Sequence, residues 1–169
     1  LAGAREVHTC DLNRLLKPDL MRDCARLLGD ELPRIARVAG VPLDEVQARH
    51  AALRLDADTP EAMTGGAVRY HAPCDVAALP LPDGSVDVVF SNSVLEHVPP
   101  DALPSLHAGA RRLLRSGGAA FHSVNCGDHY AYVDHTIHQL NYLQFSDAQW
   151  AFWNNRFLYQ NRLRAHELV

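Results

Sequence analysis

The first half of the chain carries one strand pattern followed by several helical ones. Residues 5–10 alternate between apolar and polar side chains, which predicts a short strand. Over residues 18–28 the apolar side chains recur at helical spacing, with a proline in the first turn and a glycine directly after the last. Residues 30–40 and 42–53 predict two more short helices, and residues 56–66 have the composition of a loop.

The second half alternates strands with helices. A strand is predicted at residues 67–71, and residues 86–91 form a nearly continuous apolar run, as in a strand buried on both faces of a parallel sheet. Residues 101–115 predict an amphipathic helix with arginines near its negative C-terminal end. A glycine pair ends this helix before a strand at 119–124. The capping box S-D-A-Q then opens a helix over residues 146–159.

The order of these elements predicts an α/β fold with a parallel sheet, because strands alternate with crossover helices. In such sheets, ligands bind beyond the carboxyl ends of the strands. Polar residues follow the predicted strands directly or nearly so, at Asp11, Asp75, Ser91-Asn92 and Asn125. We therefore expect a ligand site at this edge of the sheet.

Composition narrows the class of protein. The 169 residues suffice for one full-sized domain, and a net charge of −4 argues against a strongly basic nucleic-acid binder. The longest stretch free of Asp, Glu, Lys and Arg is twelve residues, well short of the ~20 that a transmembrane helix needs. The four cysteines show no C-x-x-C spacing, so we expect free thiols in a reducing cytoplasm.

Two segments carry a family resemblance. Residues 74–98 read CDVAALPLPDGSVDVVFSNSVLEHV, and residues 110–124 read ARRLLRSGGAAFHSV. In this order and spacing they resemble the class I S-adenosylmethionine-dependent methyltransferases, closest to the small-molecule branch. The resemblance implies a Rossmann-like three-layer fold, S-adenosylmethionine as cofactor and methyl transfer as the reaction. Residues 128–164 resemble a subgroup that modifies sugars, polysaccharides and lipids, which implies a small-molecule, sugar-linked or lipid-linked acceptor, while the net charge argues against a nucleic-acid partner.

One family feature has no counterpart. The glycine-rich loop after the family's first strand is not present, because no G-x-G-x-G occurs among the 169 residues. The chain opens at Leu1 without a methionine and closes without a stop signal. We therefore expect a single partial methyltransferase domain that holds the second to fifth strands and lacks the first and last, and that is inactive by itself. Its expected parts are a helical variable region (12–66), a cofactor-binding core (67–124) and an acceptor-side segment (125–169).

The resemblance assigns cofactor contacts to residues at the strand ends. Asp11 would accept hydrogen bonds from the ribose hydroxyls, since a carboxylate offers two acceptor oxygens and no donor. Asp75 would accept from the adenine amino group, and the N–H of Val76 would serve a ring nitrogen. The backbone of Ser91 and Asn92 would border the methionine part and the transferred methyl. The alternative for each is an ordinary turn or strand-exit residue.

Two histidines are candidates for the general base. His97 belongs to the Glu96-His97 pair of the resemblance, and histidine suits proton transfer near neutral pH. The alternative is that His97 packs at the start of the next helix. His129 follows Asp128, and this pair is a candidate for contact with the acceptor.

The His- and Asp-rich stretch of residues 122–138 also raises a metal hypothesis. Asp134, His135 and His138 would share a face if this stretch were helical. No tight motif such as H-E-x-x-H occurs, so the sequence favours acceptor binding or packed side chains, and predicts no metal ligand.

Aromatic residues crowd the last predicted helix. Trp150, Trp153 and Phe157 follow i, i+3, i+7 spacing and are predicted to be core. Phe152 and Tyr159 lie off that face and are candidates for covering an acceptor pocket.

Two rival functions come from other classes of protein. A non-catalytic Rossmann-like binding module would keep the sheet without the cofactor loop. A metal hydrolase would use the histidines of residues 122–138. The sequence leaves the oligomeric state open.

Overall fold

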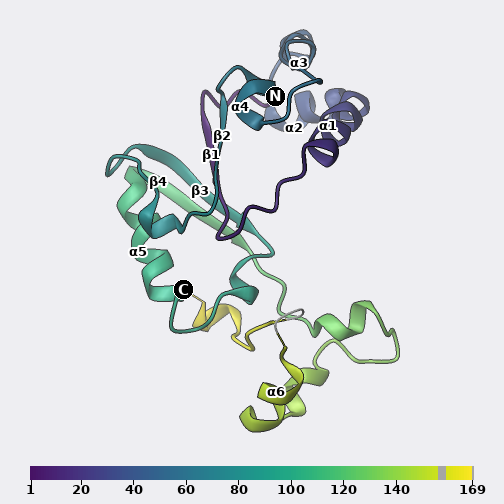
Figure 1. Cartoon of the computed structure of the whole chain (residues 1–169), viewed down its shortest axis with the longest axis vertical. Coiled ribbons are helices and arrows are strands. Elements are labelled where there is room, and N and C mark those ends of the chain that lie inside the picture. Colours follow the sequence, from purple (N-terminus) through teal and green to yellow (C-terminus); the bar gives the residue numbers. More distant parts are fainter. Residues whose placement is uncertain (156–158, 169) are drawn as a thin grey trace. The chain divides into compact units, whose positions relative to one another are not determined.

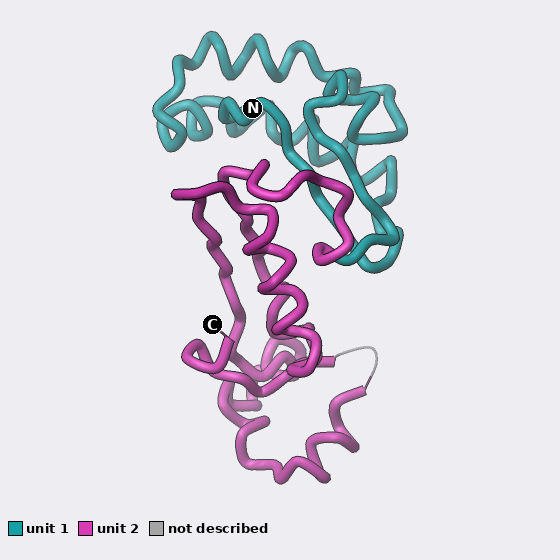
Figure 2. Tube along the Cα trace, turned by 90° about the vertical axis from the view of Figure 1, so that its left-hand side faces the viewer, with its two compact units in different colours: residues 1–75 teal, residues 76–169 magenta. Residues whose placement is uncertain are grey.

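The computed structural model describes residues 1–155 and 159–168 and divides into two compact units, residues 1–75 and 76–169 (Figure 2). Each unit contains one pair of parallel strands together with its own helices (Figure 1). The strand pairing therefore agrees with the expected α/β class. Within the described ranges, no helix is both long enough and apolar enough to cross a bilayer.

The first unit pairs β1 (Val7–Cys10) with β2 (Val68–His71) in parallel, in a register that places Val7 opposite Val68. Four helices connect the two strands: α1 (Pro18–Leu27), α2 (Leu32–Ala39), α3 (Leu43–Ala51) and α4 (Pro60–Thr64). A 3₁₀ turn, Leu28–Glu31, joins the first two helices. Small apolar clusters hold the helices together, one of them formed by Leu32, Ala36 and Val46.

Helix α4 corrects the expectation of a loop over residues 56–66. The hydroxyl of Thr59 accepts from the N–H of Ala62 at 3.2 Å, and Pro60 occupies the first helical position. A cap of this kind followed by proline is a helix start. Gly65, with a φ of +62°, ends the helix after about one turn and a half. In so short a helix the capping residues make up much of the segment, so residues 56–66 have the composition of a loop.

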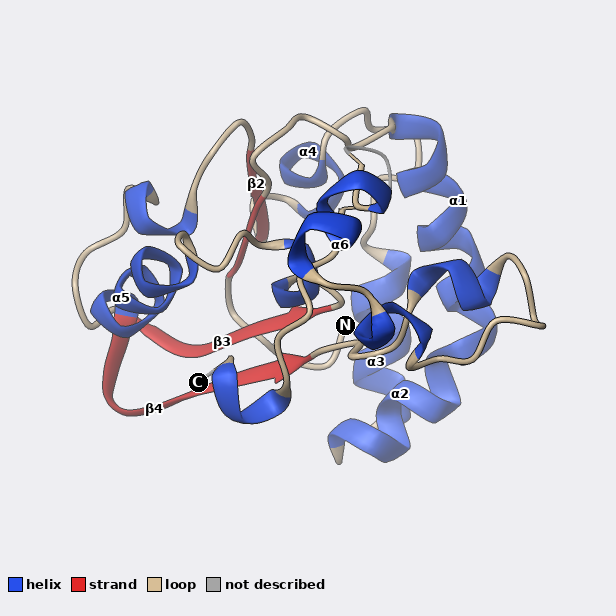
Figure 3. Cartoon of the chain, turned by 90° about the horizontal axis from the view of Figure 1, so that it is seen from below, coloured by secondary structure: helices blue, strands red, loops and turns tan. Residues whose placement is uncertain are grey.

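The second unit pairs β3 (Val86–Asn92) in parallel with β4 (Leu114–Ser123), and α5 (Leu103–Leu113) connects them (Figure 3). Short 3₁₀ turns occur at Val76–Ala78, Leu95–His97, His129–Tyr132, Asn141–Gln144 and Ala165–Glu167, and α6 covers Asp147–Trp153. Gly109 permits close packing of α5, because a Cβ there would lie 2.6 Å from the Cα of Ala77.

Strand β4 begins five residues earlier than the sequence predicts. Val86 pairs with Leu114, whereas Val88 pairs with Ala119, so the intervening residues of β4 form a bulge. Gly117 lies in this bulge with a φ of +75°, a conformation that glycine adopts without strain. The glycine pair predicted to end the helix therefore lies inside the strand.

The prediction that β3 is buried on both faces is wrong. Val88 is 49% exposed and Phe90 is 72% exposed, and Phe121 on β4 is 62% exposed. Among the described residues, β3 and β4 form a sheet of only two strands. A sheet this narrow leaves side chains uncovered that a wider, two-sided α/β sheet would bury.

Helix α6 ends at Trp153, earlier than predicted. The side chain of Asn154, directly after the helix, bonds the backbone of Gln160 twice, accepting from its N–H at 2.8 Å and donating to its carbonyl at 3.0 Å. Trp150 is buried, as predicted, but Trp153 is 49% exposed, which corrects the three-residue core stripe. Phe157 lies outside the described residues.

Candidate functional site

Asp11 directly follows β1, where the backbone fixes its position. Its N–H donates to the carbonyl of His71 at 3.0 Å, and its carbonyl accepts from the N–H of Cys74 at 2.7 Å. Its Oδ2 accepts from the hydroxyl of Tyr70 at 3.0 Å. Because a carboxylate has about four acceptor positions, Asp11 keeps capacity for further donors such as ribose hydroxyls.

Tyr70, which contacts the candidate residue Asp11, was missed by the sequence reasoning. Besides donating to Asp11, its hydroxyl accepts from the N–H groups of Leu15 at 3.2 Å and Leu16 at 3.4 Å. It thereby ties the segment after β1 to the end of β2. The signal available in the sequence was the position of Tyr70 near the end of a predicted strand.

Asp75 and Val76 are consecutive, Asp75 closing the first unit and Val76 opening the second. Asp75 is exposed, and its carbonyl accepts from the thiol of Cys74 at 3.3 Å. Val76 begins a 3₁₀ turn. Their contacts to adenine remain a prediction.

Ser91 and Asn92 are the last residues of β3, paired with His122 and Ser123 of β4. The hydroxyl of Ser91 lies 2.8 Å from Nδ1 of His122. Burial is the main cause that lowers the pKa of His122, and the neighbouring His107 lowers it further. The Ser91 side chain is therefore engaged with the neighbouring strand, and the contact of its backbone with the cofactor remains a prediction.

Glu96 and His97 lie in a tightly held 3₁₀ turn after β3. Glu96 is 2% exposed, and its Oε1 accepts from the N–H of Asn125 at 3.2 Å. Asn161 secures the turn by donating its N–H to the carbonyl of Glu96 at 2.7 Å and its side-chain amide to the carbonyl of Leu95 at 2.7 Å. The sequence identified Glu96 only as part of the pair with His97 and predicted no role for its buried carboxylate.

The structure brings His97 and His129 together, although 31 residues separate them along the chain. Their ring centroids lie 5.0 Å apart, and Nδ1 of His97 lies 2.6 Å from the carbonyl oxygen of Tyr159. Burial lowers the pKa of His129, and the neighbouring His97 lowers it further, whereas Glu96 and Asp128 act in the opposite direction and raise this pKa. His97 is exposed and precedes α5 by six residues.

The remaining His- and Asp-rich positions are not gathered in this way. Asp128 is buried, and its oxygens accept from the N–H of Tyr130 at 2.9 Å and from the amide of Asn141 at 3.1 Å, so it caps a turn. Asp134 accepts from the N–H of Thr136 at 2.9 Å, in a segment that is not helical. The shared face imagined for Asp134, His135 and His138 does not form.

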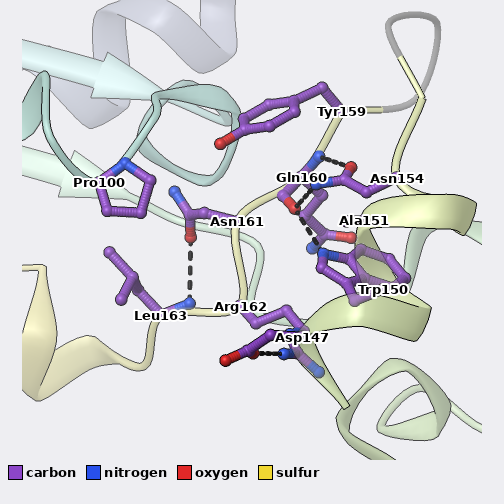
Figure 4. Close-up of a pocket in the computed structure, with 10 residues that line it drawn as sticks. All are labelled: Pro100, Asp147, Trp150, Ala151, Asn154, Tyr159, Gln160, Asn161, Arg162 and Leu163. Atoms are coloured by element: carbon purple, nitrogen blue, oxygen red, sulfur yellow. Dashed lines mark hydrogen bonds and ion pairs between the residues drawn. The ribbon is translucent and has the colours of Figure 1, made fainter. Parts of the chain in front are cut away.

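A hollow of about 340 Å³ lies between α6 and residues 159–163 (Figure 4). Tyr159 and the buried Trp150 line it, and the indole N–H of Trp150 donates to the carbonyl of Gln160 at 3.3 Å. Phe152, in contrast, is 79% exposed and is not among its lining residues. Of the two aromatic residues expected to cover an acceptor pocket, only Tyr159 borders this hollow.

Parallel strand pairs with polar residues at their carboxyl ends are the arrangement expected of nucleotide-cofactor enzymes with a Rossmann-like fold. The family described as "Methyltransferase domain" matches residues 20–122, more than half of the chain. The chain therefore belongs to the class I S-adenosylmethionine-dependent methyltransferase family.

A curated relative narrows the comparison. The chain is 29% identical over 134 residues to malonyl-[acyl-carrier protein] O-methyltransferase of Xylella fastidiosa (strain M23), covering 69% of this chain and 44% of the relative. The chain thus spans less than half the length of that protein. No solved structure matches significantly.

Proposed function

We propose that the protein transfers a methyl group from S-adenosylmethionine to a small-molecule acceptor, or to one linked to a sugar or lipid. The methyltransferase-domain match over residues 20–122 carries this proposal. That range includes Asp75, Val76, Ser91, Asn92 and His97, whereas Asp11 and His129 lie outside it. The relative from Xylella fastidiosa is named as an O-methyltransferase, which favours an oxygen acceptor for this chain.

The residues at the strand ends suit the cofactor. Bound S-adenosylmethionine supplies an electrophilic methyl group on a sulfonium sulfur. Asp11 would hold the ribose hydroxyls, because its backbone is fixed on both sides and Tyr70 orients its carboxylate. Asp75 and Val76 would contact adenine, and the backbone of Ser91 and Asn92 would border the methionine part.

The contribution of the chain to the reaction would be mainly positional. Aligning an acceptor with the methyl group can supply several kcal/mol of barrier lowering, roughly 7–11 kcal/mol at best. His97 and His129 are the proposed groups for taking a proton from the acceptor, and either would serve as a neutral imidazole. Burial lowers the pKa of the half-buried His129, which favours its neutral form.

Calorimetric titration of the full chain with S-adenosylmethionine and with its demethylated product tests the proposal. We expect both to bind at one site, weakly because no G-x-G-x-G loop occurs among the 169 residues. ATP, which shares the adenosine but not the methionine part, should bind more weakly still. Equal affinity for all three, or no binding of the first two by a folded chain, would contradict methyl transfer.

The lack of G-x-G-x-G among the 169 residues favours a second candidate, a non-catalytic binding module. This candidate predicts that the folded chain binds neither S-adenosylmethionine nor its product, so the same titration separates the two functions.

A further inference from the structure

We propose that Glu96, His97 and His129 bind a divalent transition-metal ion, with Zn²⁺ as the best match. One ligand atom from each residue lies within 4.8 Å of the other two. Among residues 1–155 and 159–168, no other group of three or more His, Cys, Asp or Glu side chains converges in this way. All three belong to the second unit, and the sequence had predicted no metal ligand.

The strongest indication is the carboxylate of Glu96. This side chain is 2% exposed, and only its Oε1 is satisfied, by the N–H of Asn125. Its Oε2 is buried with no hydrogen-bond partner among the described residues. An unpaired buried carboxylate oxygen is costly, because it has lost its water and gained nothing in return. A cation between Glu96 and the two imidazoles would supply the missing partner.

The hydrogen bond of His97 prepares this ring to bind a metal. Nδ1 lies 2.6 Å from the carbonyl oxygen of Tyr159. Because a carbonyl oxygen can only accept, Nδ1 must carry the proton, and Nε2 keeps its lone pair. Metal-binding histidines commonly donate their second nitrogen to a backbone carbonyl or carboxylate in this manner, which fixes the tautomer and the ring orientation.

His129 is held in place from its own backbone. Its N–H donates to Oε1 of Gln160 at 3.3 Å, and the neighbouring Asp128 anchors the same turn. Gln160 also donates its amide to the carbonyl of Gly127 at 2.5 Å. The ring of His129 therefore faces that of His97, at 5.0 Å between centroids and 53° between planes, without stacking on it.

The donor set selects the kind of ion. Two imidazoles and one carboxylate suit Zn²⁺ and its neighbours, whereas Mg²⁺ and Ca²⁺ prefer sites made of oxygen. Bonds of about 2.0–2.1 Å would require the ligand atoms to draw closer than they are in the free site. Three protein ligands leave a fourth position for water or an exchangeable ligand. This inference goes beyond the proposed function, because metal binding does not depend on the cofactor. In the metal-bound protein it replaces the proposed role of His97 and His129 as proton acceptors, because an imidazole nitrogen that binds a metal ion has no lone pair left for a proton.

The test is direct titration of the metal-free full chain with Zn²⁺ in competition with a chromophoric chelator. We expect one Zn²⁺ per chain, unaffected by millimolar Mg²⁺. Substitution with Co²⁺ should give the visible absorption of a four- or five-coordinate ion, and azide should alter that spectrum by entering the open position. Failure to bind Zn²⁺, or an octahedral Co²⁺ spectrum, would overturn the site.

Matched variants identify the ligands. Glu96→Gln, His97→Gln and His129→Gln should each weaken Zn²⁺ binding at least tenfold, while His135→Gln, which alters an exposed histidine of the same segment, should not. Circular dichroism verifies that each variant is folded. If Glu96→Gln does not fold, the His97→Gln variant, which alters an exposed side chain, still tests the site. Equal affinity of the His97→Gln and His135→Gln variants would refute the assignment. Cofactor titration of the same samples keeps the outcomes separate: Zn²⁺ binding without cofactor binding contradicts only the proposed function.

Discussion

The hydroxyl of Tyr70 donates to Oδ2 of Asp11 at 3.0 Å, across 59 residues of sequence. These residues occupy the ends of two paired parallel strands, since Asp11 directly follows β1 and Tyr70 lies in β2. The bond orients the carboxylate at the edge of the sheet where ligands of α/β proteins bind. It therefore gives the proposed ribose contact a preset geometry.

Asp11→Ala should weaken binding of S-adenosylmethionine at least tenfold. A hydrogen bond to a charged acceptor contributes about 1.5–3 kcal/mol, and each ~1.4 kcal/mol is a factor of ten in affinity. Tyr70→Phe should cause a smaller loss, because the carboxylate remains but is no longer oriented. Calorimetry on the folded variants measures both effects. Asp56→Ala, at an exposed position, is the control, and an Asp11→Ala variant with the control's affinity would refute the ribose role.

Stability should fall as the pH is lowered below the ordinary histidine pKa of about 6.5. Burial, aided by His107, lowers the folded-state pKa of His122, so the unfolded chain binds more protons across this window. The stabilisation from neutral His122 is thus complete above pH ~6.5 and is lost as the pH falls through the folded-state value. In denaturant titrations, His122→Gln should flatten this slope and the exposed His135→Gln should not. Identical slopes in the two variants would show that His122 does not contribute.

Gly109→Ala should destabilise the second unit. The added Cβ would meet backbone atoms of Ala77, at 2.6 Å from Cα and 2.9 Å from N, so α5 or the 76–78 turn must move. Overpacking of this kind costs about 1–3 kcal/mol. Thermal unfolding provides the measurement, with Ser105→Ala at an exposed position of the same helix as control. An unchanged midpoint for Gly109→Ala would mean that the close approach does not exist.

Ser146→Ala should loosen the start of α6. Its hydroxyl accepts from the N–H of Gln149 at 3.3 Å, and the Gln149 side chain accepts in return from the N–H of Ser146 at 2.8 Å. Losing such a cap costs about 0.5–2 kcal/mol. Hydrogen exchange of the amides in residues 147–153 should accelerate, while the exposed Ser116→Ala leaves them unchanged. Equal protection in both variants would argue against the cap.

Cys10 should react with iodoacetamide more slowly than Cys24 near neutral pH. Burial, together with Cys74, Asp11 and Asp75, raises the pKa of the Cys10 thiol, and only the thiolate is nucleophilic. Cys24, in contrast, is exposed. Mass spectrometry of the modified peptides gives the order of reaction, and denaturing the chain should remove the difference. Modification of Cys10 first in the folded chain would contradict its placement.

The sequence by itself determined several local elements of the fold. Strand cores at Val7–Cys10 and Val68–His71 follow from local spacing and residue type, and the capping box of Ser146 is complete within four residues. These signals are local, because a strand or cap depends on neighbours along the chain. The family resemblance rested in the same way on contiguous segments, and the match over residues 20–122 confirms it.

Only the tertiary structure decided which distant side chains meet. The sequence spacing could not bring His129 beside His97, leave an oxygen of Glu96 buried without a partner, or direct Tyr70 at Asp11. It also could not foresee that Phe90 is exposed, since burial of a strand depends on how many neighbours the sheet has. Contacts of this kind depend on the path of the chain through space, and hydrophobic periodicity reports only on one element at a time.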